Sequence, residues 1–336
     1  MILTTDWILI IQIIISAYVA KYYYDYFTRQ SPLPGPLPLP LIGNLHQVGL
    51  NPAKYFMDHH EKFGDMFEIW VGSKRFIVLS RASLIDQIFI PNTRSKFFSR
   101  ILIPNFQKDG MQHGLLFNND HQEWKRKRKF VVQSLMSPGF LKQFIHLTQS
   151  LFNENESFWD KKEYHIDFAR WIKCFTTDIT LQTVTRKPPY CLNTYLFGED
   201  HNDNSDPIKS EEIKESVKFA RSAQTFLYTI LFQIFVPEKL KDYVPGFYQL
   251  NKNYQKNTDW LNATILNIIK KRRMEISNGE KLDSNLLDIL LTLNTPYDQN
   301  PHDEGETPMT DQEIRATLLE VCMAGTDTVR YNYFIN

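Results

Sequence analysis

The sequence has few cysteines, no excess of either charge and no internal repeat, and each absence excludes a class of protein. The three cysteines, Cys174, Cys191 and Cys322, are too scattered for a disulfide framework or a CxxC metal site. A reducing compartment fits this cysteine usage best. Lysine plus arginine and aspartate plus glutamate both number 38, so the overall charge gives no case for binding nucleic acid.

The apolar content is high, and its pattern along the chain is mostly helical. Hydrophobic residues make up 43% of the chain and aromatic residues 14%, enough to bury a sizeable core in one large domain or two. An amphipathic helix is predicted at 52–63, followed by a β-hairpin that turns at 72–74. Beyond residue 81 the pattern is helical, with polar loops at 91–92, 137–139, 187–206 and 294–308. The sequence therefore predicts a mainly α fold with a small β-sheet.

The N-terminal segment carries a long apolar run. Residues 7–20 read WILIIQIIISAYVA, and the flanking aromatic residues bring the run close to the length of about 20 that a membrane span needs. We interpret residues 1–30 as a transmembrane anchor, because a signal peptide would show a basic start and a small-residue cleavage site. Lys21 and Arg29 follow the run and Asp6 precedes it, which predicts that the body lies on the cytoplasmic side.

A proline-rich segment, SPLPGPLPLPLIGN, follows at residues 31–44. Proline lacks a backbone donor and fixes its own φ angle, so neither a helix nor a central strand is predicted there. One interpretation is a semi-rigid hinge between anchor and body, and the other is a ligand for an SH3-type domain. We favour the hinge, because the segment leads directly into a folded pattern.

The stretch from Pro308 to Thr328, PMTDQEIRATLLEVCMAGTDT, predicts a largely buried helix with an interruption. Thr310 and Glu313 form a capping box, so the helix is predicted to begin at about Asp311. Its side chains then become very small at residues 324–325, although a glycine inside a helix costs about 1 kcal/mol relative to alanine.

Two explanations of this interruption remain open. One is a close crossing of two helices, combined with hydroxyls that bond to carbonyls one turn earlier. The other is a notch in a central helix, at which a flat cofactor or a diatomic ligand approaches the backbone. In that case Asp327 and Thr328 would be an acid and an alcohol that deliver protons.

A basic helix is predicted at residues 121–130, HQEWKRKRKF. Trp124 and Arg128 are four residues apart, so they share a helix face and can grip an anionic group against an aromatic wall. The cations around them are Lys125, Arg126, Lys127 and Lys129. Such a run is most often a solvated face and less often a polyanion or nuclear-import patch; a docking site for an acidic partner protein is the third alternative.

The anchor, the hinge ending in PLIGN, the W-x-x-x-R helix and the A-G-x-D-T helix together resemble the microsomal cytochrome P450 haem-thiolate monooxygenases. The order and spacing of these four motifs match that family. The segments FGDMFEIWVG, GLLFNNDHQEW and LLDILL are similar to family segments as well. Four motifs in register make the resemblance specific.

The resemblance implies contacts to a cofactor. Trp124 and Arg128 would hold a propionate of haem b, and Ala324 and Gly325 would form the oxygen-binding kink of the long helix. Electrons would come from NADPH through a reductase. That reductase would dock near Lys125, Arg126, Lys127 and Lys129.

The resemblance also implies a proton relay. Asp327 and Thr328 would pass protons to dioxygen. The family usually continues with threonine or serine, whereas this sequence has Val329, which weakens any hydrogen-bonding role at that position and leaves Thr328 untouched. The implied reaction inserts one oxygen atom into a small apolar organic substrate.

The iron ligand of the family is a cysteine in a later F-x-x-G-x-R-x-C-x-G loop. None of the three cysteines has that context, so the axial ligand is expected outside this chain, and no metal ligand is predicted within it. The chain is expected to be a truncated form, inactive by itself, that matches the N-terminal two-thirds of the enzyme. The alternative is a non-catalytic, membrane-tethered pseudoenzyme or interaction module.

The predicted organisation is therefore an anchor at 1–30, a hinge at 31–44 and a partial P450 domain at 45–336. The resemblance places the protein at the endoplasmic reticulum, with its body in the cytosol. Membrane lipid, a reductase and a small apolar substrate are the expected partners.

Overall fold

The structure is a computed structural model that describes residues 2–48, 52–72, 74–89, 99–100, 102–161, 167–186, 191–192, 207–298 and 306–332. For residues 326–332 the description covers the backbone alone. The chain forms two compact units, residues 1–97 with 231–251, and residues 98–230 with 252–336. The boundaries predicted at residues 30 and 44 separate an anchor, a hinge and a body by their composition. They stay a prediction.

The first unit combines an N-terminal helix with a two-stranded antiparallel sheet. Strand β1 pairs with β2 in a register that places Trp70 opposite Arg75, so the predicted hairpin is confirmed. The predicted helix at 52–63 is confirmed as well. The elements of this unit are α1 (Ile2–Phe27), α2 (Leu45–Val48), α3 (Pro52–Phe63), β1 (Met66–Val71), β2 (Lys74–Leu79), α4 (Ala82–Phe89) and α11 (Glu238–Tyr243).

Helix α1 has two parts with different surroundings. The stretch Trp7–Phe27 is long and apolar enough to cross a membrane, and most of its side chains are exposed. Near its end, however, Tyr22 and Tyr26 are buried, and their rings lie 6.3 and 5.8 Å from the ring of Trp70 in β1. The last two turns of the helix therefore pack on the sheet, and the apolar run before them is exposed.

An ion-pair cluster reinforces this packing. Glu68 of β1 is 1% exposed and accepts from Arg75 Nε at 2.7 Å. The guanidinium of Arg29, just beyond α1, pairs with the same carboxylate and stacks on Tyr26, with its central carbon 4.0 Å from the ring centroid. One buried carboxylate thus joins the end of α1 to both strands.

The proline-rich segment is docked along β1. Asn44 is buried; its backbone N–H donates to Trp70 O at 2.7 Å, and its Oδ1 accepts from Trp70 N at 2.7 Å. Gly43 has φ +62°, and a Cβ there would meet the carbonyl of Trp70. The PLIGN motif thus needs glycine for close approach and asparagine for pairing. The proline-rich segment is therefore packed into the folded unit and is more than a spacer.

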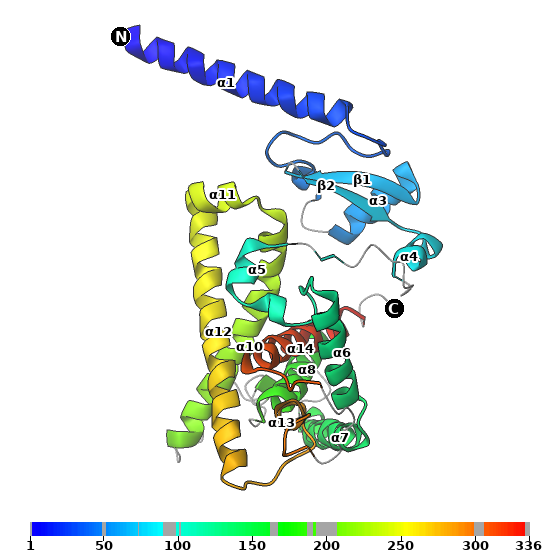
Figure 1. The fold of residues 1–336 in the computed structure, drawn as a ribbon, viewed down its shortest axis with the longest axis vertical. Helices are drawn as coiled ribbons and strands as arrows, with labels where there is room; N and C mark the ends of the chain where they lie inside the picture. Colours follow the sequence, from blue (N-terminus) through cyan, green and yellow to red (C-terminus); the bar gives the residue numbers. More distant parts are fainter. Residues whose placement is uncertain are drawn as a thin grey trace. The chain divides into compact units, whose positions relative to one another are not determined.

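The second unit is an assembly of helices around α14 (Asp311–Asn332). Figure 1 shows α14 lying among α6, α8 and α12, which contribute side chains that contact it. The other elements are α5 (Pro104–Lys108), the 3-10 helix η1 (Met111–His113), α6 (His121–Leu135), α7 (Pro138–Lys161), α8 (Phe168–Thr185), α10 (Pro207–Phe235), α12 (Pro245–Ser277) and α13 (Leu286–Thr292). Helices α10 and α12 each have one end in the first unit.

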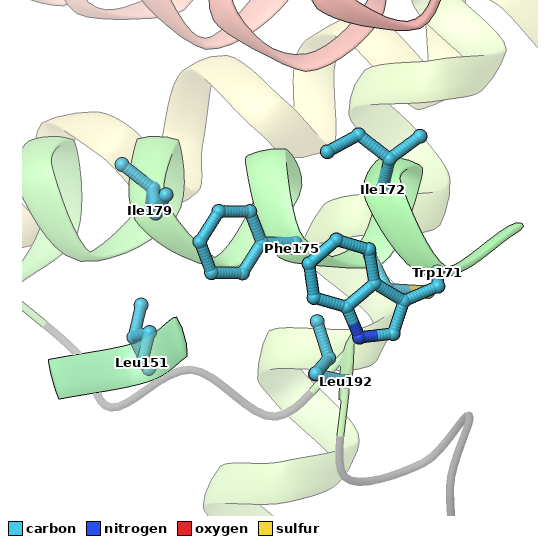
Figure 2. Close-up of a cluster of buried hydrophobic side chains, with 7 residues drawn as sticks. Leu151, Trp171, Ile172, Phe175, Ile179 and Leu192 are labelled. Carbon is cyan, nitrogen blue, oxygen red and sulfur yellow. The ribbon is translucent and has the colours of Figure 1, made fainter. Parts of the chain in front are cut away.

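The buried faces of these helices make the core. Its fully buried side chains include Phe106, Phe130, Phe226, Tyr254, Leu261, Ile265, Leu286, Ile314 and Leu318. A second cluster, shown in Figure 2, joins the start of α8 to Leu151 of α7 and to Leu192. The loop predicted at 137–139 is corrected, because Pro138 and Gly139 are the first residues of α7 and only a short break separates them from α6. Proline suits the first turn of a helix, where its missing N–H is not needed.

Candidate functional site

Helix α14 begins with the capping box that the sequence predicts. Thr310 N donates to Glu313 Oε2 at 2.8 Å, and Glu313 N donates to Thr310 Oγ1 at 3.3 Å. The helix begins at Asp311, as predicted. This reciprocal pair satisfies backbone donors that would otherwise lack partners at the helix start.

Glu313 has a second role that links α14 to α6. Its carboxylate pairs with Arg126, and it lies 3.2 Å from Lys127 Nζ. Lys127 is 3% exposed. The prediction that the four cations around Trp124 form one docking face is therefore wrong for Lys127, whose charge is neutralised inside the protein. Arg126 is also largely buried, and Lys129 pairs with Glu306 at 3.5 Å, which leaves Lys125 exposed.

Charged residues of α14 also hold residues 109–116, the segment just before α6. Glu320, 5% exposed, accepts from Leu115 N at 2.6 Å and from Leu116 N at 3.0 Å. Burial raises the pKa of Glu320 to about 7. Arg315 Nη2 donates to Gly110 O at 3.1 Å. Sequence reasoning missed both residues, although charges inside the apolar stripe IRATLLE were a signal that they are paired.

The same segment is held from α12. Tyr254 Oη donates to Asp109 Oδ2 at 2.8 Å, and Asn262 Nδ2 donates to Asp109 O at 3.3 Å. Burial raises the pKa of Asp109 to about 6, against the lowering effect of the Tyr254 hydrogen bond. Residues 109–116 therefore lie between two helices that both bond to their backbone.

Trp124 and Arg128 share one face of α6, as their spacing predicts. The guanidinium carbon of Arg128 lies 5.4 Å from the ring centroid of Trp124. Arg128 is exposed, and among the described residues no carboxylate is found within ion-pair distance of it, in contrast to Arg126, Lys127 and Lys129. A cation held against an indole without a carboxylate partner fits an anionic group supplied from outside this part of the chain.

Helix α14 runs without a break through Ala324 and Gly325, and Gly325 lies where it crosses α8. A Cβ on Gly325 would come within 2.6 Å of Thr180 Oγ1 and 3.1 Å of Thr180 Cγ2. Thr180 is buried, and its hydroxyl already donates to Thr176 O at 2.7 Å. The close helix crossing therefore accounts for the glycine, while the neighbouring Ala324 is exposed. The cofactor-binding roles predicted for Ala324 and Gly325 stay predictions.

Replacing Gly325 by alanine is expected to destabilise the chain by about 1–2 kcal/mol, because overpacking a core costs about 1–3 kcal/mol and exceeds the gain in helix propensity. Removing the opposing atoms with Thr180→Ala should restore most of that loss in the double variant, as measured by thermal unfolding. Gly246→Ala is the matched control, since nothing lies within 4 Å of the added Cβ. Equal losses from Gly325→Ala with and without Thr180→Ala would show that the crossing is not the reason for the glycine.

The remaining predicted residues are placed by backbone or burial only. Asp327 and Thr328 lie on α14, one turn after Ala324, and their side chains lie outside the described residues. Cys322 is buried on α14, where burial raises the pKa of its thiol to about 12. In the described part of the chain, no group of three or more histidine, cysteine, aspartate or glutamate side chains could hold a metal ion.

Two features thus characterise the site: a long helix, α14, that is buried over most of its described length and contains the small residues Ala324 and Gly325, and the Trp124–Arg128 pair on α6, the helix that is bonded to the start of α14. A family model for cytochrome P450 matches residues 33–331. The chain belongs to the cytochrome P450 family.

Individual relatives agree with this membership. Cytochrome P450 83A1 of Arabidopsis thaliana is 23% identical over 305 residues, which cover 88% of this chain and 54% of that protein. Cytochrome P450 2C55 of Mus musculus is 24% identical over 298 residues, covering 88% and 55%. The chain spans about half the length of these curated relatives.

A solved structure, the retinoic acid bound cyanobacterial CYP120A1, matches with a TM-score of 0.58 at 16% identity. The match covers 89% of this chain and 58% of that one. At that identity the likeness shows the fold, which is mainly α with a small sheet, as the sequence predicts.

Proposed function

We propose that this protein acts as a haem-dependent monooxygenase, which inserts one atom of dioxygen into an apolar organic substrate with electrons from NADPH through a reductase. The observation that supports this function best is the Trp124–Arg128 pair, because Arg128 presents an exposed cation against an aromatic wall and no carboxylate of the described residues pairs with it. The two residues would hold a haem propionate.

Haem iron, when bound, supplies the oxygen chemistry, and the residues of α14 supply room and protons. The exposed methyl group of Ala324 leaves space beside the helix axis, while Gly325 lets α14 lie close to α8. Asp327 would hold and release a proton through its carboxyl group, and the Thr328 hydroxyl would pass it on. These two residues lie one turn beyond the small side chain of Ala324.

None of the three cysteines of this chain serves as the iron ligand in our proposal. Cys174 and Cys322 lie buried in the middle of helices α8 and α14, where their side chains pack in the core. Cys191 packs against the same cluster as Cys174. A thiolate ligand needs a fixed loop position beneath the porphyrin and hydrogen bonds that favour the charged form, and burial here favours the neutral thiol of Cys322.

The membrane and partner assignments rest on the exposed parts of the chain. Helix α1 would anchor the protein in the endoplasmic reticulum, with the body in the cytosol, because cations follow the apolar run. Lys125 is the exposed cation that would meet an acidic reductase surface, with Lys129 half-buried beside it. Arg126 and Lys127 stabilise the junction of α6 and α14 instead.

Haem content tests the proposed function. In a protein that carries a family cysteine loop after this chain, Arg128→Ala should weaken haem binding by about 10- to 100-fold, since a hydrogen bond to a charged group contributes about 1.5–3 kcal/mol. The pyridine haemochrome assay measures haem per protein. Lys125→Ala, which removes an exposed cation of the same helix, should leave it unchanged.

The 336-residue chain without that loop should show no thiolate-type carbon monoxide difference spectrum, because its own cysteines cannot provide the ligand. Unchanged haem content in Arg128→Ala would contradict the assignment of that residue. If the protein that carries the cysteine loop binds no haem at all, that result would instead favour a non-catalytic, membrane-tethered module.

Two N-terminal deletions test the anchor. Removing residues 2–20 should release the chain from membranes into the soluble fraction, while Tyr22, Tyr26 and Arg29 still pack on the sheet. Removing residues 2–30 should release it as well but also lower the thermal midpoint, because Glu68 loses a partner. Sedimentation after a high-salt wash and thermal unfolding are the measurements. A 2–20 deletion that stays with membranes would show that another surface holds the lipid.

A further inference from the structure

Two of the three cysteines lie together, although they are far from the candidate site residues in the sequence. Cys174 of α8 is 8% exposed and belongs to the cluster of Trp171, Phe175 and Leu192 drawn in Figure 2. Cys191 is half-buried and packs against the same cluster. One thiol is thus in the core and the other at its edge, within reach of small solutes.

A buried carboxylate fixes this arrangement. Asp178, 1% exposed, accepts from Cys191 N at 2.9 Å and from Leu192 N at 2.8 Å. Asp178 follows Cys174 by four residues, so both point from the same face of α8. The helical turn at residues 191–192 is therefore held against the part of α8 that carries Cys174, and both cysteines pack in the same cluster.

The thiols interact directly. A hydrogen bond between them lowers the pKa of Cys174, despite its burial, and raises the pKa of Cys191. A thiol beside a thiolate can donate a hydrogen bond to it and so favours the charged form of its neighbour. A thiolate beside a second thiol is the arrangement in which oxidation leads to a disulfide rather than to higher oxides.

We propose that Cys174 and Cys191 are an oxidative modification site, which a hydroperoxide converts into a reversible intramolecular disulfide. The sulfur of one cysteine of the pair attacks the O–O bond and keeps one oxygen as a sulfenic acid, while the rest leaves as water or an alcohol. The sulfur of the other cysteine then attacks the sulfenic sulfur, and its proton leaves with the hydroxyl as water. Two S–H bonds are lost, one S–S bond forms, and the peroxide takes up the two electrons.

Cys322 provides the internal comparison. It is also buried and forms no disulfide, but it lies on α14, outside the cluster of Cys174, and burial raises the pKa of its thiol to about 12. The same oxidant should leave this thiol unmodified. The neighbour that distinguishes Cys174 is Cys191, which packs against its cluster, since burial is common to Cys174 and Cys322.

The test is graded hydrogen peroxide treatment of the folded chain, followed by alkylation and peptide mass spectrometry without reductant. We expect a peptide pair that links Cys174 to Cys191, lighter by two hydrogens than its parts and released by dithiothreitol, with Cys322 still open to alkylation after denaturation. Cys174→Ser and Cys191→Ser should each abolish the link. Asp178→Asn, which weakens the clamp, should slow its formation several-fold.

Exposed methionines show whether the oxidant was sufficient. Met57 and Met136 are both 65% exposed, so their sulfoxides report the dose that reached the protein. Sulfoxide at both residues without a 174–191 link would overturn the proposal, and so would a link that joins two chains or includes Cys322. A link that forms at or below the dose that oxidises the methionines supports it. The outcome is independent of haem binding, so it stands apart from the proposed monooxygenase function.

Discussion

Replacing Glu313 by alanine is expected to lower the free energy of unfolding by about 3 kcal/mol, the lower end for breaking a buried ion pair, because Lys127 then keeps only the more exposed Glu123 as a partner. Lys127 is the charge left behind, at 3% exposure, and Arg126 loses its contact with the same carboxylate. The capping box with Thr310 is lost as well. Urea unfolding at neutral pH measures the change.

Glu306→Ala is the matched control. It also breaks an ion pair of α6, with Lys129, but both side chains are more than a third exposed, so a loss below about 1 kcal/mol is expected. Glu313→Gln should lie between the two, since it keeps acceptor atoms for Thr310 and removes the charge. Similar losses for Glu313→Ala and Glu306→Ala would contradict the buried pair.

The pH dependence of Glu313 gives a second measurement. Burial raises its pKa, but hydrogen bonds from Thr310 and Lys127 outweigh that effect and hold the pKa below its ordinary value. Its contribution to stability is therefore present above the unfolded pKa of about 4.3 and is lost as the pH falls through the lower folded value. Glu313→Ala should cost less in acid than at neutral pH.

Glu320 is expected to show the opposite dependence on pH. Its folded pKa of about 7 exceeds the unfolded value, so the folded state binds the proton more tightly. The stability that Glu320 contributes is then fully present below about pH 4.5 and is lost as the pH rises through 7. The change over that range is up to about 3 kcal/mol, from a shift of roughly 2.5 pKa units at 1.36 kcal/mol each.

Glu320→Gln should remove this slope, because the amide does not titrate. The measurement is the free energy of unfolding of both proteins from pH 4.5 to 8, compared as a difference. That difference cancels the contribution of Asp109, whose pKa of about 6 also lies in the range. Parallel curves for the two proteins would rule out a titrating Glu320. A slope that disappears in the variant would show that burial of the charged carboxylate is what costs stability as the pH rises.

The basic helix α6 shows which structural features a local sequence pattern can predict and which it cannot. The spacing of Trp124 and Arg128 predicts a shared face, and the structure confirms it, because positions four apart on a helix are always neighbours. The same helix was interpreted as one solvated or docking face, and Lys127 proves to be buried. Its partner Glu313 lies in a distant part of the chain, so no pattern within the helix indicates which cation turns inward.

The proline-rich segment shows a similar limit. Its prolines exclude helix and central strand, and the structure agrees. What the composition cannot indicate is that Asn44 and Gly43 pair with the backbone of Trp70, since that contact needs β1 to lie alongside. A proline-rich hinge and a proline-rich segment that packs along a strand place the same requirements on the local sequence.

The sequence by itself determined the features that depend on residues a few positions apart: the start of α14 at a capping box, the apolar helix at the N-terminus, the hairpin, and the order of motifs that marks the P450 family. Tertiary structure alone decided which partner each buried group meets. Arg126 and Glu313 are 187 residues apart, and Leu115 and Glu320 are 205 apart. Burial makes each of these charges dependent on its partner, and only the packing of helices far apart in the sequence brings the two together.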